Sequence, residues 1–592
     1  MGYCTKILIG INLALFCNLK WYNIAHKTWL IMKNTGLQQP DRVLHRDQVK
    51  LSTNFFDSDR MLQDYIRKYI PEKSRKYMMP KWHKTGERAA CEMDELSLLA
   101  DQNEPELIRR DKWGEEINEI RFHPAYWRLM DFAVESEMMR IKWDPDCRRR
   151  FRGERNTLSF ISGFIYSLSE MGQYCPLCMT DGAALLLDRY ADEETRERIM
   201  PGFSATDGRS LTTGAMYLTE KSGGSDVGAN LVEAHHENGR WYRLYGEKWF
   251  CSNANNDVAM VLARTDPEKP GTRGLSLFLV EPKFPDGTVN PVNVVRIKDK
   301  MGVRSMASAE CRFEGTRAWL IGEEFEGFKM MTDMINLSRL YNSVAGVAGT
   351  RRALIEAYQF LINRRSFGRE MLDHALIREK LNELGALHVA NFLLVWRTVR
   401  AMDAAENGDE QEAERLRLLI PMAKWWSAEK SVYVAREAME LMGGIGYIED
   451  QVMPKLLRDV NVLPIWEGSG NIIVLDMLRA MYKSDGMKYL REEINSLISK
   501  HTVPDDIKQF KEKVFRELDE LPDMDQDTRE ASAKPTFLRL IHLYQALLMK
   551  QEDEEWADLA FQWYQQRVLQ QAPGRITPAG RDEVEKIIAW MI

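Results

Sequence analysis

The chain has 592 residues with 81 Lys+Arg and 88 Asp+Glu, so its formal net charge is −7. This length exceeds what one hydrophobic core serves, and three or four domains are expected. Hydrophobic residues make up 44% and charged residues 29%, values typical of globular proteins in water. The acidic balance excludes a general electrostatic attraction to nucleic acid.

The eight cysteines are scattered along the chain, which favours reduced thiols in a cytoplasmic protein over a disulfide framework. Cys175 and Cys178 form a CxxC. No second Cys or His cluster completes a zinc site, so we predict a buried helix turn here and no metal.

The first 31 residues contain an apolar run, ILIGINLALFC, that begins after Lys6. It is shorter than the roughly 20 residues that a membrane-spanning helix needs, and no small-residue cleavage site follows it. We expect residues 1–31 to be a non-native or unstructured extension, with Met32 as the true start. A short membrane anchor is the alternative, although stable membrane insertion is not expected.

The rest of the chain alternates between helical and strand patterns. Residues 41–212 show apolar positions at helical spacing and predict an N-terminal helical domain. Residues 213–323 hold short β-rich runs separated by Gly, Pro, Asn and Asp, which predict an antiparallel β-barrel domain. The fold class is therefore expected to be α+β and mainly helical.

Long amphipathic runs return after the strands. The runs at 330–363, 374–406 and 410–442 have short connections, so residues 324–482 are expected to form an antiparallel four-helix bundle. Residues 483–592 predict four or five more helices, interrupted by prolines, as a C-terminal helical extension.

The most informative stretch lies at the end of the expected bundle, where GGIGY at 443–447 is followed by Arg458-Asp459 and by IWEGSGN at 465–471. Glu467 stands between an indole and a flexible Gly-Ser-Gly turn. Desolvation by Trp466 is expected to raise the pKa of the Glu467 carboxyl, while a helix start or a cation lowers it. A helix cap beside a core Trp explains the same pattern, and spacing alone favours that explanation.

Together these three motifs resemble the C-terminal active-site segment of the acyl-CoA dehydrogenase family, and more closely its AidB-like branch. The resemblance spans roughly residues 45 to 592. It implies that Glu467 removes the α-proton of a fatty acyl-CoA thioester while the β-hydride passes to N5 of FAD. It also implies that Arg339, in Asn336-Leu-Ser-Arg339, lies near that carboxylate as a second catalytic residue. There it would lower the carboxyl pKa or bind the thioester end of CoA, although an ordinary solvated Arg fits the spacing equally well.

Two stretches within the expected barrel resemble the flavin-binding segments of the family. One runs from Leu218 to Val227 and implies that Thr219 and Ser225 bind the flavin or CoA. The other is Glu247 to Ser252, which implies that Trp249 stacks on the flavin. The family has Thr where this chain has Cys251, so the N5 contact is assigned to Ser252 or to backbone amides. The remaining residues that the resemblance assigns to the cofactor are Leu218, Phe250, Cys251, Glu440, Gly443, Gly444, Trp466, Ser469 and Asn471; those assigned to substrate are Ser225, Arg339 and Gly468.

The segment Arg364-Arg365-Ser366-Phe367-Gly368 resembles the turn that binds the FAD pyrophosphate of a neighbouring subunit. The planar fork of Arg364 suits a phosphate, and Phe367 supports the adenine end. The resemblance therefore implies a homotetramer built as a dimer of dimers. Ala375 and Glu440 replace residues that are Gln in many relatives, and we expect altered contacts to the adenosine rather than loss of FAD.

The partners that the resemblance implies are an acyl-CoA substrate and electron-transfer flavoprotein or a similar acceptor. Two other functions remain open: a flavoprotein that binds and protects DNA, and a lipid regulator that sequesters an acyl chain without turnover. Residues 483–592 hold 16 Lys+Arg and 21 Asp+Glu. Because phosphate contacts need clustered cations, this acidic extension argues against DNA.

Overall fold

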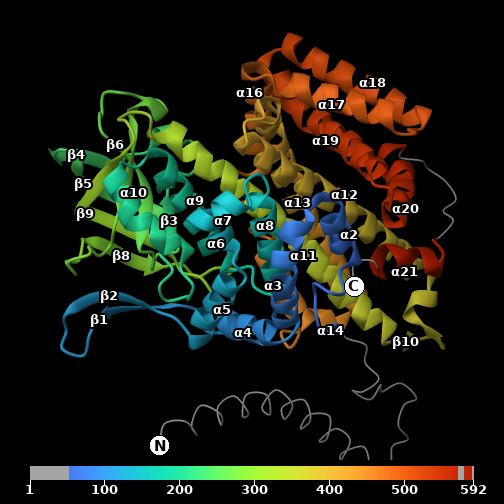
Figure 1. Ribbon diagram of the computed structural model, residues 1–592, viewed down its shortest axis with the longest axis horizontal. Helices are drawn as coiled ribbons and strands as arrows, with labels where there is room; N and C mark the ends of the chain where they lie inside the picture. The colour runs from blue at the N-terminus through green and yellow to red at the C-terminus, as the bar shows by residue number, and fades with distance from the viewer. Residues whose placement is uncertain (1–51, 571–578, 590–592) are drawn as a thin grey trace, which may run out of the picture.

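The computed structural model describes residues 52–570 and 579–589, so the extension expected at 1–31 lies outside the described residues. The chain begins with a helical layer, as predicted (Figure 1). Its helices are α2 (Arg60–Tyr69), α3 (Glu72–Ala90), α4 (Glu92–Gln102), α5 (Pro124–Glu135), α6 (Met138–Trp143), α7 (Pro145–Arg150), α8 (Arg155–Ser167), α9 (Tyr174–Tyr190) and α10 (Glu193–Ile199).

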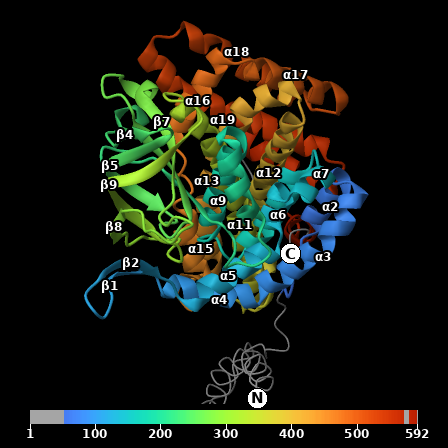
Figure 2. The ribbon, with the colours of Figure 1, turned by 60° about the vertical axis from the view of Figure 1, so that its left-hand side comes forward.

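A hairpin that the helical prediction missed interrupts this layer. Strands β1 (Glu106–Arg110) and β2 (Glu116–Arg121) pair antiparallel around a turn in which Gly114 has a φ of +89°. Nearly all residues of both strands are exposed or half-buried, and the hairpin extends away from the helices (Figure 2). A strand pair without a buried face has no apolar alternation, which is why a search for hydrophobic periodicity passed over it.

The strands that follow form one seven-stranded sheet, and it is mixed rather than antiparallel. Both β3 and β4 run parallel to β6, while the other pairings are antiparallel. The parallel pairs arise because the β4–β5 hairpin comes between β3 and β6 in the sequence and returns the chain to the end of the sheet at which β3 began. The antiparallel barrel is therefore not confirmed. The strands are β3 (Gly214–Tyr217), β4 (Glu233–Asn238), β5 (Trp241–Ser252), β6 (Val258–Arg264), β7 (Leu275–Val280), β8 (Val292–Ile297) and β9 (Ser308–Ile321).

Three long helices follow the sheet within two or three residues of the predicted limits. Helices α11 (Gly327–Ile362), α12 (Ala375–Glu406) and α13 (Glu410–Met442) pack against one another, and α16 (Gly470–Lys483) packs against α13. Between α11 and α12 lies the short pair β10 (Arg365–Ser366) and β11 (Arg369–Glu370). Two short helices, α14 (Gly444–Tyr447) and α15 (Val452–Val460), lead from α13 to the turn that holds Glu467.

The C-terminal region is helical, as predicted, and folds back along the long helices (Figure 1). A single apolar core joins it to the rest of the chain, because Trp82, Trp396 and Trp556 are all buried in one cluster that runs from α3 through α12 to α20. The sheet keeps a second core of its own. The described helices here are α17 (Gly486–Lys500), α18 (Asp505–Glu520), α19 (Gln526–Gln551), α20 (Glu555–Tyr564) and α21 (Arg581–Ala589).

Within residues 52–570 and 579–589, no helix combines the length and the apolar character that crossing a membrane requires.

Candidate active site

The turn between α15 and α16 places Glu467 in a backbone conformation that favours glycine. Glu467 has a φ of +56° and Gly468 a φ of +97°. Two cations from different helices hold the carbonyls of this turn. Arg339 on α11 donates its Nε–H to the carbonyl of Glu467 at 3.2 Å, and Lys424 on α13 donates from Nζ to the carbonyl of Gly468 at 2.6 Å. The backbone of the turn is thereby held by both helices.

The Glu467 carboxyl is crowded by protein atoms and only half-buried by surface exposure, so it is shielded from water yet reachable. Burial raises its pKa to about 7, against the opposing charges of Arg339 and Lys424. Arg339 has a carboxylate of its own, since it also forms an ion pair with Asp476. A carboxyl with a pKa near 7 ionises readily at neutral pH and accepts a proton far better than an ordinary Glu.

Lys424 was missed by the sequence analysis. Burial lowers the pKa of its ammonium to about 7, while the charge of Glu467 raises it and that of Arg339 lowers it further. The signal was present in the sequence, because Lys424 lies in the apolar run LLIPMAKWW of α13. A lysine at a buried position of a helix marks either a paired charge or a functional site.

Helix α9 forms the wall that faces Glu467. The charge of Glu467 acts on the thiols of Cys175 and Cys178 in the first turns of this helix. Burial, with that charge, raises the pKa of Cys175 to about 12 and that of Cys178 well above its usual range, so both are neutral thiols at physiological pH. In the described part of the chain, no group of His, Cys, Asp or Glu side chains is arranged to hold a metal ion.

The same helix is anchored by Asp181, which is fully buried. Its carboxylate pairs with Lys142, accepts the Nε1–H of Trp143 at 2.8 Å and accepts the hydroxyl of Tyr341 at 2.9 Å. These contacts join α9 to α6 and to α11, the helix that carries Arg339. The position of the α9 wall relative to Glu467 is set by one buried carboxylate.

The loop predicted to bind the flavin or CoA is built around a buried ion pair. Lys248 of β5 binds Glu220 at 2.8 Å and donates to the carbonyl of Leu218 at 3.2 Å. The backbone N–H of Trp249 donates to the carbonyl of Thr219 at 2.9 Å. Leu218 and Thr219 are therefore held against β5, while Ser225 is exposed on the outer part of the loop.

The four residues of β5 that were assigned to the cofactor differ in burial and do not all lie on one face of the strand. Cys251 is completely buried in the core of the sheet beside Cys311, so it cannot contact a flavin outside that core. Ser252 is half-buried and its hydroxyl lies 3.2 Å from that of Ser308, while Phe250 is 53% exposed. Because Phe250 and Ser252 are two residues apart, they share the face opposite Cys251. The geometry favours these two as the flavin contacts and disfavours Cys251.

Trp249 lies where the pairing of β5 with β9 is irregular. The ammonium of Lys298 lies 3.8 Å from the centre of its indole ring, and that of Lys221 lies 5.1 Å from the same point. A ring with cations this close has strong cation–π partners already. The Lys298 ammonium also lies 4.6 Å from the centre of the Phe250 ring, so the stacking predicted for Trp249 stays a prediction.

The residues assigned to the far end of FAD lie on the other side of the molecule. In Figure 1 the β10 strand, which follows Arg364, lies at the end of the long helices opposite the sheet that contains β5. Phe367 is 92% exposed, and the guanidinium of Arg364 stacks on Phe360 without an ion pair in the described residues. Glu440, in contrast, pairs with Arg436.

The end of α13 offers an open backbone surface. A Cβ added to Gly443 or Gly444 would meet no atom within 4 Å, and Tyr447 beside them is 77% exposed. Trp466 is half-buried, Ser469 is exposed at the start of α16, and the side chain of Asn471 accepts a hydrogen bond from Lys534 of α19 at 3.3 Å. The open glycines, the exposed Phe250 and Phe367 rings and the unpaired Arg364 fit the flat rings and the pyrophosphate of FAD.

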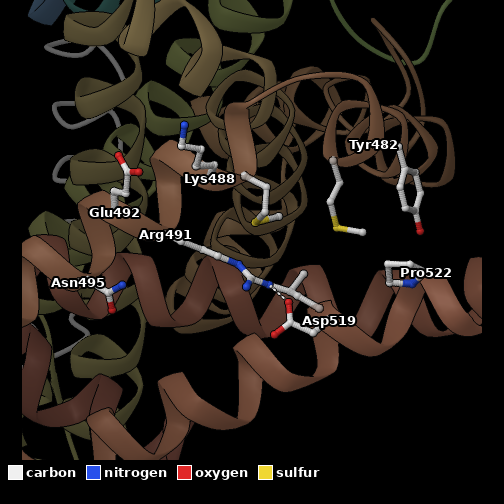
Figure 3. Close-up of a pocket in the computed structure, with 10 residues that line it drawn as sticks. Tyr482, Lys488, Arg491, Glu492, Asn495, Asp519 and Pro522 are labelled. Atoms are coloured by element: carbon white, nitrogen blue, oxygen red, sulfur yellow. Dashed lines mark ion pairs between the residues drawn. The ribbon is translucent and has the colours of Figure 1, made fainter.

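A cavity of about 510 Å³ lies between α16, α17 and α18, well away from these residues (Figure 3). Arg491 and Asp519 form an ion pair of 2.7 Å within it. Methionines line its inner part, and Tyr482 and Pro522 stand at one end. No predicted site residue lines this cavity, so it is not assigned to the acyl-CoA site.

Comparison with known proteins identifies the class. Residues 48–207 match the domain family "Adaptive response protein AidB N-terminal domain", 215–316 match "Acyl-CoA dehydrogenase, middle domain", and 326–482 match "Acyl-CoA dehydrogenase, C-terminal domain". The chain belongs to the acyl-CoA dehydrogenase family, whose members are oxidoreductases that bind FAD.

Particular relatives agree with this assignment. The chain is 35% identical to the putative acyl-CoA dehydrogenase AidB of Escherichia coli over 67% of its own length and 73% of the relative. It is similar to the crystal structure of ACDH-11 from Caenorhabditis elegans in complex with C11-CoA, with a TM-score of 0.81, 26% identity and coverage of 90% of this chain and 94% of that chain. An acyl-CoA dehydrogenase from Bacillus anthracis complexed with FAD shares the fold at a TM-score of 0.65 and 19% identity, with coverage of 92% and 96%.

We expect Lys424→Met to raise the pKa of Glu467 further, because the carboxylate loses a nearby positive charge. The Glu467 carboxyl can accept a proton only when it is ionised, so flavin reduction by the wild-type protein should slow as the pH drops below about 7. In the variant this fall should begin about one pH unit higher, which corresponds to an interaction of about 1.4 kcal/mol. The measurement is the pH dependence of flavin reduction by an acyl-CoA.

Lys430→Met is the matched control, since Lys430 is another lysine of α13 that stacks on Trp426 and does not contact the Glu467 turn. An unchanged pH profile in Lys424→Met, with FAD still bound, would show that Lys424 does not act on Glu467.

Proposed function

We propose that the chain is an FAD-dependent acyl-CoA dehydrogenase that oxidises the α,β bond of a fatty acyl-CoA thioester, with Glu467 as the base that removes the α-proton. The observation that carries this proposal is the state of Glu467: a half-buried carboxyl with a pKa of about 7, held by Arg339 and Lys424 in a left-handed turn. A structural helix cap has no need of a raised pKa or of two converging cations.

In this mechanism each contribution of the chain is local. The ionised Glu467 accepts the α-proton, and the positive charges of Arg339 and Lys424 keep the carboxylate accessible at neutral pH. The backbone N–H of Glu467, which donates to no carbonyl in the described residues, is the donor that we assign to the thioester carbonyl. A fixed N–H at that oxygen stabilises the charge that develops as the α-proton leaves.

Bound FAD would supply the acceptor for the β-hydride. Phe250, Ser252 and the loop from Leu218 to Ser225 would hold its ring end, with Ser225 and Gly468 beside the substrate. Trp466, Ser469 and Asn471 would shape the site around Glu467. The neutral thiols of Cys175 and Cys178 would line the side that faces the carboxylate without competing with it as nucleophiles. We assign electron-transfer flavoprotein or a similar protein as the acceptor that reoxidises the cofactor.

The distance between β5 and β10 along the molecule supports a shared site. Arg364 and Phe367 would hold the pyrophosphate and adenine of an FAD whose ring lies in another subunit, with Gly443 and Gly444 beside the adenosine. This arrangement requires an oligomer, and we propose a homotetramer built as a dimer of dimers.

Glu467→Gln tests the base directly. The amide is nearly isosteric but cannot accept a proton, so the variant should keep its FAD while acyl-CoA reduces the flavin at least about 100-fold more slowly. Stopped-flow absorbance of the flavin with a panel of acyl-CoAs is the measurement. Glu429→Gln is the control, because Glu429 is an exposed carboxylate of α13 whose charge also acts on Lys424.

Reduction of the Glu467→Gln flavin at the wild-type rate would exclude Glu467 as the base. Tight binding of acyl-CoA by the wild-type protein without any flavin reduction would instead favour the acyl-sequestering regulator.

Arg364→Ala should weaken FAD retention and oligomer stability together, because one guanidinium would serve both the cofactor and the interface. The matched control is Arg365→Ala, which removes the same charge from the neighbouring residue. The Arg365 side chain contacts only the Gly368 carbonyl within the described residues. FAD content after gel filtration and the mass of the eluted species are the readouts. Full FAD occupancy in Arg364→Ala with an intact oligomer would contradict the shared site.

Duplex DNA is expected to bind only in the weak non-specific range, with a Kd on the order of 10⁻⁴ to 10⁻⁶ M at physiological salt. The acidic excess of residues 483–592 repels a phosphate backbone. Two arginines of this region are already paired, since Arg567 binds Glu379 and Arg581 binds Glu370 and Asp373. Anisotropy titration with a labelled duplex is the test. Nanomolar affinity with a steep salt dependence would make the DNA-protecting flavoprotein the better description.

A further inference from the structure

Four arginines line a cavity of about 230 Å³ at the junction of α7, α8 and the end of α12. The segment that carries them reads CRRRFRGER over 147–155, and its sharp turn is made by Gly153 at a φ of +93°. Arg149, Arg152 and Gly153 are exposed, so the cavity opens to solvent. The arginines are Arg148, Arg149, Arg152 and Arg155, and the other lining residues are Gly153, Glu406 and Asn407.

The cavity has a rigid floor. The first turn of α8 is capped from α12, because the carboxylate of Asp403 accepts the backbone N–H groups of Asn156 at 2.9 Å and Thr157 at 2.8 Å. Glu406, three residues further on, accepts Nε–H and Nη2–H of Arg155 at 3.1 and 3.0 Å and the amide of Asn156 at 2.7 Å, all on one oxygen. The one carboxylate that lines the cavity is therefore already neutralised.

The arginines retain hydrogen-bond donors that these contacts do not use. A guanidinium has five N–H groups. Arg148 uses one N–H on each terminal nitrogen for Asp188, at 2.8 Å each, and Arg155 uses two N–H groups for Glu406. Arg149 pairs only with Asp146 of its own helix. Arg152, which is exposed at the cavity, has no ion pair within residues 52–570 and 579–589.

We propose that this cavity is a binding site for a small phosphate-bearing anion. Planar guanidinium groups match the oxygens of a phosphate better than an ammonium does. Four of them at one concavity provide oriented donors, and Arg152 provides a charge that no carboxylate neutralises within the described residues. The cavity volume suits a phosphate group and a short substituent rather than a whole nucleotide. Its elements do not include the Glu467 turn, β5 or β10, so the site is separate from the proposed acyl-CoA and FAD sites.

Such an anion would bridge two segments that are far apart in the sequence. It would contact Arg148 on α7 and Arg152 on the α7–α8 turn, and it would lie against Asn407 at the end of α12. A ligand that binds the folded chain and joins these segments raises the stability of the protein by mass action. The consequence is measurable without any assay of enzyme activity, so its failure is distinct from a failure of the proposed function.

The experiment is a thermal unfolding titration of the FAD-bound full chain with inorganic phosphate and with glycerol 1-phosphate, at ionic strength held constant with KCl. The unfolding midpoint should rise and saturate for the wild-type protein. Arg152→Gln should need about tenfold more ligand for the same rise, since a charge-assisted hydrogen bond of this kind is lost. Arg150→Gln is the control, because this substitution removes one positive charge nearby. The Arg150 guanidinium stacks on Tyr77 and Phe151 and does not line the cavity.

A larger effect of glycerol 1-phosphate than of phosphate would identify an organic phosphate as the ligand, and the reverse order would identify free phosphate. An equal response in wild type, Arg152→Gln and Arg150→Gln would overturn the assignment, as would no response beyond that of KCl. Binding of duplex DNA that depends on Arg152, without saturation by phosphate, would show that the cavity is part of a nucleic-acid surface instead.

Discussion

The candidate active site depends on the hydrogen bonds that Arg339 and Lys424 donate to two consecutive carbonyls of the Glu467 turn. A non-glycine residue held at positive φ costs on the order of 1–3 kcal/mol. The hydrogen bonds from Arg339 to the Glu467 carbonyl and from Lys424 to the Gly468 carbonyl have charged donors, and bonds of that kind contribute about 1.5–3 kcal/mol each. The combined free energy of these two hydrogen bonds exceeds the strain of the positive φ, so it is large enough to hold the turn in one conformation.

The same two cations oppose the desolvation of the carboxyl, and the balance determines its chemistry. Burial alone would keep Glu467 protonated, and full pairing with Arg339 would make it too weak a base. Arg339 is shared with Asp476 and Lys424 is itself driven toward neutrality by burial, so neither cation is wholly committed to the carboxylate. A pKa of about 7 results from this incomplete compensation. The helices that carry the cations must be held firmly, and the buried contacts of Asp181 do so for α11.

Patterns within short segments of the sequence predicted those structural features that a short segment determines. The long helices, the strand-rich segment and the IWEGSGN turn are each encoded within about 30 residues, and the structure has them. Lys424 was missed because its role depends on a turn 44 residues further along the chain. The burial of the Cys251 side chain could not be predicted, because a bulge in β5 decides which side chains enter the core and a bulge has no clear signature in one strand. The parallel pairing of β3 with β6 depends on the path of the chain between them, which no single segment specifies.

The position of Arg364 shows why the cofactor assignments could not be settled within one chain. Its guanidinium stacks on Phe360 and has no ion pair among the described residues, and the ring of Phe367 in the β10–β11 turn is 92% exposed. An uncovered aromatic ring beside an unpaired arginine gains little stability in a monomer, whereas a pyrophosphate and an adenine would satisfy both at once. The ring-binding residues on β5 lie on the opposite side of the molecule. In the proposed oligomer a second copy of the chain would join the two halves of one FAD site, and cofactor affinity would then depend on protein concentration.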